Sequence, residues 1–297
     1  MRVFVTGATG FVGSAVVREL LDAGHRVTGL ARSDASAEAL RAAGAQVHRG
    51  ALDDPDSLRR GAAAADGVIH TAFIHDFSRH AENCQVDARA IAALGEGLAG
   101  SERPLLVTSG TAVLPQGRLG IEADRADPAS APPRAISETA ALALLPQRVR
   151  AMVLRLPPSV HGAGDHGFVP ALIGIARDTG VAAYLGDGSN RWPAVHRADA
   201  ARLFRLALEH GEAGTCYHGN AEEGIAFREI AAVIGRHLQL PVRSLPAEAA
   251  PAQFGWMARF AGRDMPTSSA WTREQLGWQP SGPGLLQELD DAGYFAG

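Results

Sequence analysis

Three regularly spaced glycines constrain this chain more than any other feature of its sequence. An apolar run at residues 3–6 leads into Gly7, Gly10 and Gly13, and a helical pattern spans residues 11–23. In a strand–turn–helix unit, such glycines permit the tight turn, the approach of a pyrophosphate and the packing of the helix on the sheet. The free N–H groups that begin the helix attract phosphate. We therefore predict a dinucleotide site at this turn, with contacts from Gly7, Thr9, Gly10, Phe11, Val12 and Gly13.

Strand and helix patterns continue to alternate through the first half of the chain. The expected strands are residues 3–6, 26–31, 46–49, 67–71, 105–108 and 151–156. The expected helices are residues 11–23, 35–43, a segment that begins at Asp54-Pro55, 84–98 and 134–145. Apolar strands alternating with helices form parallel sheets with right-handed crossovers. The prediction for residues 1–157 is an α/β fold with a doubly wound parallel sheet, a Rossmann fold that binds a dinucleotide.

The pattern changes after Pro157-Pro158. Helical periodicity recurs at residues 168–177, 199–210, 227–238 and 248–260, between glycine- and proline-rich turns. We predict that residues 158–297 form a smaller, mostly helical substrate-binding lobe, and that segments near 190–220 return to the sheet.

Composition excludes several classes of function. All 28 basic residues are arginine, so mechanisms that need a lysine are excluded. Two cysteines form neither a disulfide framework nor a metal cluster, and no metal site is expected. A net charge of −4 argues against binding to nucleic acid. The longest stretch without Asp, Glu or Arg, residues 3–17, is too short to span a membrane, and no signal peptide is recognisable. We expect a cytoplasmic protein with a small-molecule substrate.

The end of the second strand bears on the choice of cofactor. Enzymes that use NAD place a carboxylate there on the ribose, whereas this chain has Ala31 followed by Arg32 and Ser33. Arg32 and Ser33 can bind a 2′-phosphate through charge-assisted hydrogen bonds, which predicts NADP. The alternative is that Arg32 is a solvated surface residue and Asp34 contacts the ribose.

Six ordered motifs resemble those of the extended short-chain dehydrogenase/reductase superfamily, the NAD(P)-dependent epimerase/dehydratase-like proteins. They are TGATGFVG at 6–13, GALD at 50–53, HTA at 70–72, RLPPSVHG at 155–162, GDG at 186–188 with VHRAD at 195–199, and LGWQP at 276–280. The resemblance implies further cofactor contacts from Leu52, Thr71, Ala72, Phe73, Pro158 and Ser159. It also implies a homodimer in which helices 84–98 and 134–145 pack against their symmetry mates.

The chain departs from this family where the catalytic dyad Tyr-x-x-x-Lys belongs. Arg134 stands in place of the tyrosine and Glu138 in place of the lysine. The spacing suggests that Arg134 pairs with Glu138 one helical turn away, or binds an anion. Strict alignment puts Gly110 at the family's Ser/Thr position, between Ser109 and Thr111.

Other side chains must therefore supply any proton exchange or substrate contact. The candidate catalytic residues are Ser109, Thr111, Asp87, His161 and Arg134. His161, in a loop expected beside the nicotinamide, is the leading proton donor, with a packed loop histidine as the alternative. Asp87 either orients water or pairs with Arg89 or Arg134. His75 is a weaker candidate donor, His196 is expected to be structural, and Arg191 is a candidate anion binder.

Three hypotheses of function remain. The first is an NADP(H)-dependent oxidoreductase that acts on a small carbonyl or alcohol through a non-standard proton relay. The second is a protein that binds NADP(H) as a sensor or regulator without turnover. The third is a sugar-type epimerase or dehydratase, which suffers most from the missing tyrosine base. Retained motifs around the nicotinamide favour the first, because a sensor needs only the phosphate and adenine contacts.

Overall fold

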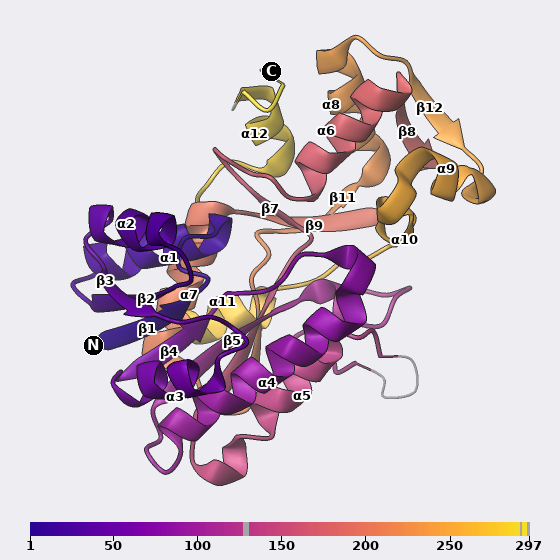
Figure 1. The fold of residues 1–297 in the computed structure, drawn as a ribbon. Helices are drawn as coiled ribbons and strands as arrows, with labels where there is room; N and C mark the ends of the chain where they lie inside the picture. The colour runs from indigo at the N-terminus through magenta and orange to yellow at the C-terminus, as the bar shows by residue number, and fades with distance from the viewer. Residues whose placement is uncertain (127–130, 292, 296–297) are drawn as a thin grey trace.

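A seven-stranded sheet forms the centre of the computed structural model, which describes residues 1–126, 131–291 and 293–295 (Figure 1). The strand order is β10-β6-β5-β4-β1-β2-β3, and every neighbouring pair is parallel. These strands are β1 Arg2–Thr6, β2 Arg26–Ala31, β3 Gln46–Arg49, β4 Gly67–His70, β5 Pro104–Gly110, β6 Arg150–Leu156 and β10 Cys216–His218. The predicted α/β fold with a doubly wound parallel sheet is confirmed.

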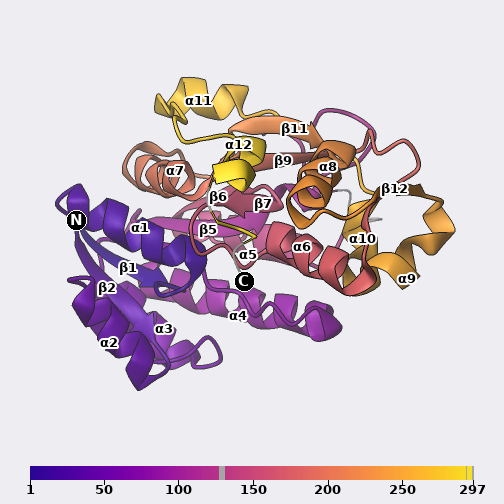
Figure 2. The ribbon, with the colours of Figure 1, turned by 90° about the horizontal axis from the view of Figure 1, so that it is seen from above.

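Helices cover both faces of this sheet (Figure 2). One face buries apolar side chains of α1 Phe11–Asp22, α2 Asp34–Ala42 and α7 Arg197–His210. The other face buries those of α3 Pro55–Ala63, α4 His80–Leu98 and α5 Ala135–Leu142. The chain leaves β1 in one direction and returns to β4 on its other side, so the carboxyl ends of β1 and β4 flank a switch point, where doubly wound sheets bind ligands.

Local signals explain most of the helix boundaries. Ser33 caps α2, because its hydroxyl accepts a hydrogen bond from the Ser36 amide at 3.2 Å. The Asp54 carboxylate caps α3 in the same way, and Pro55 occupies the first turn, where its missing N–H costs nothing. Two helices of the first half differ from prediction by more than two residues at one end: α4 begins at His80 rather than residue 84, and α5 ends at Leu142 rather than residue 145.

The second half of the chain contains two small sheets in addition to its helices. It contains a three-stranded sheet of order β11-β9-β7 and a two-stranded sheet of β12 and β8. These strands are β7 Ser159–His161, β8 Ala182–Leu185, β9 Arg191–His196, β11 Glu222–Ala226 and β12 Val242–Leu245. Of the segment expected to return to the central sheet, β10 does so, whereas β9 joins the three-stranded sheet.

The remaining helices of this half pack around the small sheets, except α11, which packs on α7. They are α6 Phe168–Thr179, α8 Phe227–Leu238, α9 Ala250–Phe254, α10 Ala258–Ala261, α11 Ala270–Leu276 and α12 Leu285–Asp291. The single helix expected at residues 248–260 is broken at Gly255, whose φ of +52° is incompatible with a continuous helix. No helix in the described residues is long and apolar enough to cross a membrane. The expected homodimer stays a prediction, although α4 and α5 do pack side by side (Figure 1).

Candidate active site

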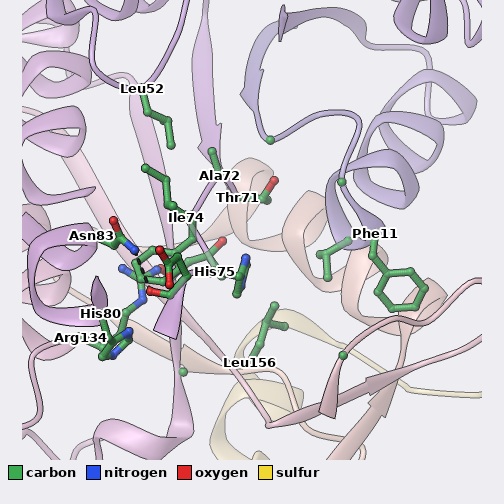
Figure 3. Close-up of a pocket in the computed structure, with 18 of the residues that line it drawn as sticks. Phe11, Leu52, Thr71, Ala72, Ile74, His75, His80, Asn83, Arg134 and Leu156 are labelled. Carbon is green, nitrogen blue, oxygen red and sulfur yellow. Dashed lines mark hydrogen bonds between the residues drawn. The ribbon is translucent and has the colours of Figure 1, made fainter. Parts of the chain in front are cut away.

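A cleft of about 1720 Å³ opens at the carboxyl ends of the central strands. Its walls include the turn after β1, the ends of β4, β5 and β6, and residues of α6 and the α9–α10 region. Figure 3 shows side chains from these segments, among them Phe11, Thr71, His75, Arg134 and Leu156, around a common space. The cleft therefore joins the Rossmann half to the C-terminal half of the chain.

The glycine turn forms one end of this cleft. Gly7 has a φ of +68°, and a Cβ atom there would lie 2.6 Å from the Ala72 amide nitrogen. At Gly13, a Cβ atom would collide with the Gly7 carbonyl oxygen. Gly10 is the N-cap of α1 and has no side-chain capping hydrogen bond, so backbone N–H groups at the start of this helix are available to a ligand. This cradle fits the pyrophosphate of a dinucleotide.

At the end of β2, the two residues predicted to bind the 2′-phosphate of NADP have different surroundings. Arg32 lines the cleft, whereas the Ser33 hydroxyl caps α2 and lies outside the lining; Ser36 lines the cleft instead. The Asp34 carboxylate pairs with Arg49 and is 91% exposed. The alternative in which Asp34 contacts the ribose therefore finds no support in this geometry.

Most other predicted cofactor residues also line the cleft. Its lining includes Gly7, Thr9, Gly10, Phe11, Val12, Gly13, Leu52, Thr71, Ala72, Phe73 and Pro158. Ser159 lies outside it, at the start of β7, and its buried hydroxyl has no hydrogen-bond partner among the described residues.

Asp87 is the centre of a buried polar cluster beside the cleft. His70 Nε2 donates to Asp87 Oδ1 at 3.0 Å, and the Thr6 hydroxyl lies 2.7 Å from His70 Nδ1. Asp87 Oδ2 accepts from Ser137 Oγ at 2.6 Å and pairs with Arg134 Nη1. Burial opposes ionisation, but the hydrogen bond and charge of His70, followed by the charge of Arg134, lower the pKa of Asp87 to about 2. Asp87 is thus a fixed anion that holds its neighbours in place.

Arg134 extends from this cluster to the wall of the cleft. Its Nη2 donates to the Thr108 carbonyl oxygen at 2.8 Å, and its guanidinium lies 4.1 Å from the centre of the Phe73 ring. The side chain is 16% exposed and lines the cleft. The pairing of Asp87 with Arg134 was one of the two predicted roles of Asp87.

The predicted pair between Arg134 and Glu138 is wrong. Glu138 instead pairs with Arg155 of β6, through bonds of 2.8 and 2.7 Å from Nε and Nη2. Arg155 Nη1 also lies 3.1 Å from His218 Nε2, in a region closed to solvent. Arg155 lowers the pKa of Glu138 against the opposing effect of burial. Partners distant in sequence outcompete the local helical spacing at both positions.

The two hydroxyls around Gly110 take different positions. Ser109 lines the cleft at the end of β5. Thr111 is buried outside the lining, and its hydroxyl has no hydrogen-bond partner within the described chain.

His161, the leading predicted proton donor, does not reach the cleft. Its side chain is fully buried on β7, and its ring lies 5.6 Å from that of His196. Burial, together with the charge of His196, lowers its pKa to about 4, so the ring is neutral near pH 7. The placement fits the alternative of a packed histidine.

His75 does line the cleft, and burial and Arg134 lower its pKa as well. His196 caps α7.

Several lining residues carried no signal in the sequence. Phe168, Trp256, Phe260 and Arg263 form part of the wall contributed by the C-terminal half. Three of the four lie in or just after the segment where the expected helix at residues 248–260 is broken, so the predicted helix does not place their side chains. Arg191, a predicted anion binder, instead pairs with Asp264 at 2.8 Å in a separate hollow. Among the described residues, no group of three or more His, Cys, Asp or Glu could hold a metal ion.

The doubly wound sheet, the glycine turn and the cleft at the switch point define a Rossmann-type protein that depends on a nucleotide cofactor. The chain belongs to the NAD dependent epimerase/dehydratase family, whose sequence profile matches residues 3–219. This confirms the resemblance that the motifs indicated.

Three comparisons illustrate the range of similar proteins. The chain is 54% identical over 296 residues to the uncharacterized protein C2A9.02 of Schizosaccharomyces pombe, covering 99% of this chain and 100% of that protein. It is 31% identical to 2-alkyl-3-oxoalkanoate reductase of Stenotrophomonas maltophilia, covering 74% of this chain and 69% of that enzyme. The fold matches that of DesIV, a dTDP-glucose 4,6-dehydratase from Streptomyces venezuelae, with a TM-score of 0.77 at 21% identity over 98% of this chain and 96% of that one.

Proposed function

We propose that the protein is an NADP(H)-dependent oxidoreductase that acts on a small carbonyl or alcohol substrate. The main support is that one cleft runs from the glycine turn to Arg134 and the aromatic side chains of the C-terminal half. A sensor that only bound the cofactor would need the first part of this cleft and not the second. The similarity to 2-alkyl-3-oxoalkanoate reductase adds support from a relative that is itself named as a reductase.

The Rossmann half would hold the cofactor. The N–H groups at the start of α1 would bind its pyrophosphate, and Arg32 would bind the 2′-phosphate. When bound, the nicotinamide ring supplies or accepts a hydride.

Arg134 is the side chain that we assign to the substrate oxygen. Asp87 and the Thr108 carbonyl hold its guanidinium at the wall of the cleft, so little reorganisation is needed for it to donate a hydrogen bond. A fixed cation stabilises negative charge that develops on the oxygen. A guanidinium does not exchange protons near neutral pH, so the proton must come from water or from a titratable side chain of the lining such as His75.

This assignment disfavours the epimerase or dehydratase hypothesis. That chemistry needs a base at the position of the family's tyrosine, where this chain has Arg134. An oxidoreductase is less affected, because it needs a polarised carbonyl and one proton.

Cofactor titration and turnover test the proposal together. We expect NADPH to bind more tightly than NADH by fluorescence titration, and Arg32→Ala to weaken NADPH binding by roughly ten- to a hundredfold, with NADH binding unchanged. Oxidation of NADPH is then followed at 340 nm with a panel of apolar aldehydes and ketones. Equal affinity of the unmutated protein for both cofactors would refute the NADP preference. Tight NADPH binding without turnover of any panel member would favour the sensor hypothesis instead.

A further inference from the structure

Arg263 is a half-buried arginine of the cleft that has no carboxylate partner among the described residues. Arg32 and Arg89 also line the cleft without an ion pair there, but both are exposed. Arg134 pairs with Asp87 and Arg79 pairs with Glu82, but Arg263 forms no ion pair across residues 1–126, 131–291 and 293–295. Its sequence neighbour Asp264 is already paired with Arg191. A half-buried cation without a counterion is costly, because its desolvation is not compensated.

Neutral groups nevertheless fix the orientation of this guanidinium. Its Nη2 donates to the Ala112 carbonyl oxygen at 3.1 Å. With the Gln116 amide turned to satisfy both side chains, Gln116 Oε1 accepts from Arg263 Nε at 2.9 Å and from Nη2 at 3.0 Å. Arg263 Nη1 makes no hydrogen bond within the described chain, so its two N–H groups remain for a ligand. Burial lowers the pKa of Arg263, and no acidic side chain within the described residues opposes this effect.

An aromatic wall shares this end of the cleft with Arg263. The rings of Phe168 and Phe260 lie 4.9 Å apart, and those of Phe168 and Trp256 lie 5.7 Å apart. All three side chains line the cleft. The wall therefore combines one oriented cation with a broad apolar surface, the pattern of a pocket that fixes a ligand with a few polar groups.

We infer that this end of the cleft binds an organic carboxylate with an apolar body, with the carboxylate on Arg263 and the body against Phe168, Trp256 and Phe260. The planar guanidinium suits a carboxylate, and the ligand would supply the charge that the chain does not. The inference rests on the proposed function, because the substrate is then an apolar oxo acid or the corresponding hydroxy acid.

Binding of two matched probes tests this inference without requiring turnover. We expect 4-phenylbutanoate to bind the full-length protein, by calorimetry, roughly ten- to a hundredfold more tightly than 4-phenylbutanol. Arg263→Met should abolish this preference by weakening only the acid. Arg263→Lys should retain part of it, because the charge remains. The matched control is Arg243→Gln, an exposed arginine of β12 outside the cleft lining, which should behave as the unmutated protein. Circular dichroism checks that each variant is folded.

Three outcomes would overturn the inference. The first is equal binding of acid and alcohol to the unmutated protein, and the second is an unchanged preference in folded Arg263→Met. The third is tighter binding of phenyl phosphate than of 4-phenylbutanoate, which would contradict the carboxylate assignment. If neutral carbonyls are reduced while the two probes bind alike, the inference fails and the proposed function stands. If the acid preference depends on Arg263 but nothing is turned over, the inference stands and the proposed function fails.

Discussion

Two buried carboxylates on neighbouring helices each pair with an arginine, but only one of these arginines reaches the cleft. Asp87 on α4 pairs with Arg134, whose side chain is 16% exposed at the wall of the cleft. Glu138 on α5 pairs with Arg155, whose side chain is 0% exposed. We call the first the open pair and the second the closed pair.

The difference shows how the structure uses the two side chains that the sequence places at the predicted dyad positions. Arg134 pairs with Asp87, and Glu138 pairs with Arg155. The open pair presents a fixed cation to the cleft. The closed pair ties α5 to β6, and through His218 to β10, with no access to a ligand. The open pair is therefore suited to function and the closed pair to stability.

The largest expected effect comes from breaking the closed pair. Arg155→Met leaves Glu138 buried without its cation, which costs about 3–5 kcal/mol of unfolding free energy. Urea denaturation at pH 7 measures this loss. The control is Arg148→Gln, which breaks the exposed pair with Glu102 and should cost no more than about 1 kcal/mol. Equal losses in the two variants would show that the closed pair contributes no more than a surface pair.

His161 is a titratable side chain that is buried away from the cleft, so its pKa tests the same contrast between the closed core and the cleft. Folding lowers the pKa of His161 from its ordinary value of 6.5 to about 4. As the pH falls through this window, the unfolded chain binds a proton that the folded chain does not, so stability is lost. The loss attributable to His161 approaches about 3 kcal/mol at pH 4.

His161→Phe should remove this part of the pH dependence. The difference in unfolding free energy between pH 7 and pH 4 should shrink by that amount, while His218, whose pKa is also lowered to about 4, keeps its own contribution. NADPH oxidation should stay within a few-fold of the unmutated protein, because His161 does not reach the cleft. A hundredfold or greater fall in kcat would instead restore His161 as the proton donor.

The parts of this structure that follow from local rules were predictable from the sequence. The glycine turn and the alternating strands and helices of the first half each depend on a few consecutive residues. The pair of Arg155 with Glu138 was not predictable, because its partners lie 17 residues apart on different elements. The pair of Asp87 with Arg134, 47 residues apart, was only one of the alternatives that the sequence left open. The short strand β7 was missed because three residues are too few to show periodicity. The place of Arg263 in the cleft wall was missed because it follows the unpredicted break at Gly255.

Breaking the open pair with Arg134→Gln should cost less stability than breaking the closed pair. Asp87 keeps its hydrogen bonds from His70 and Ser137, and water of the cleft can reach the vacated space. The loss of unfolding free energy at pH 7 should therefore be about 1–2 kcal/mol. The loss should also be smaller at pH 3. Arg134 helps to lower the pKa of Asp87 to about 2, and this stabilisation is complete above the ordinary pKa near 4 and disappears as the pH falls toward 2.

If Arg134 acts on the substrate oxygen, the same variant should lower kcat by roughly 10²–10³-fold, with NADPH affinity nearly unchanged. Urea midpoints at pH 7 and pH 3, a cofactor titration and steady-state kinetics make the four comparisons. A loss of stability as large as that of Arg155→Met, with kcat unchanged, would mean that the open pair is as structural as the closed one.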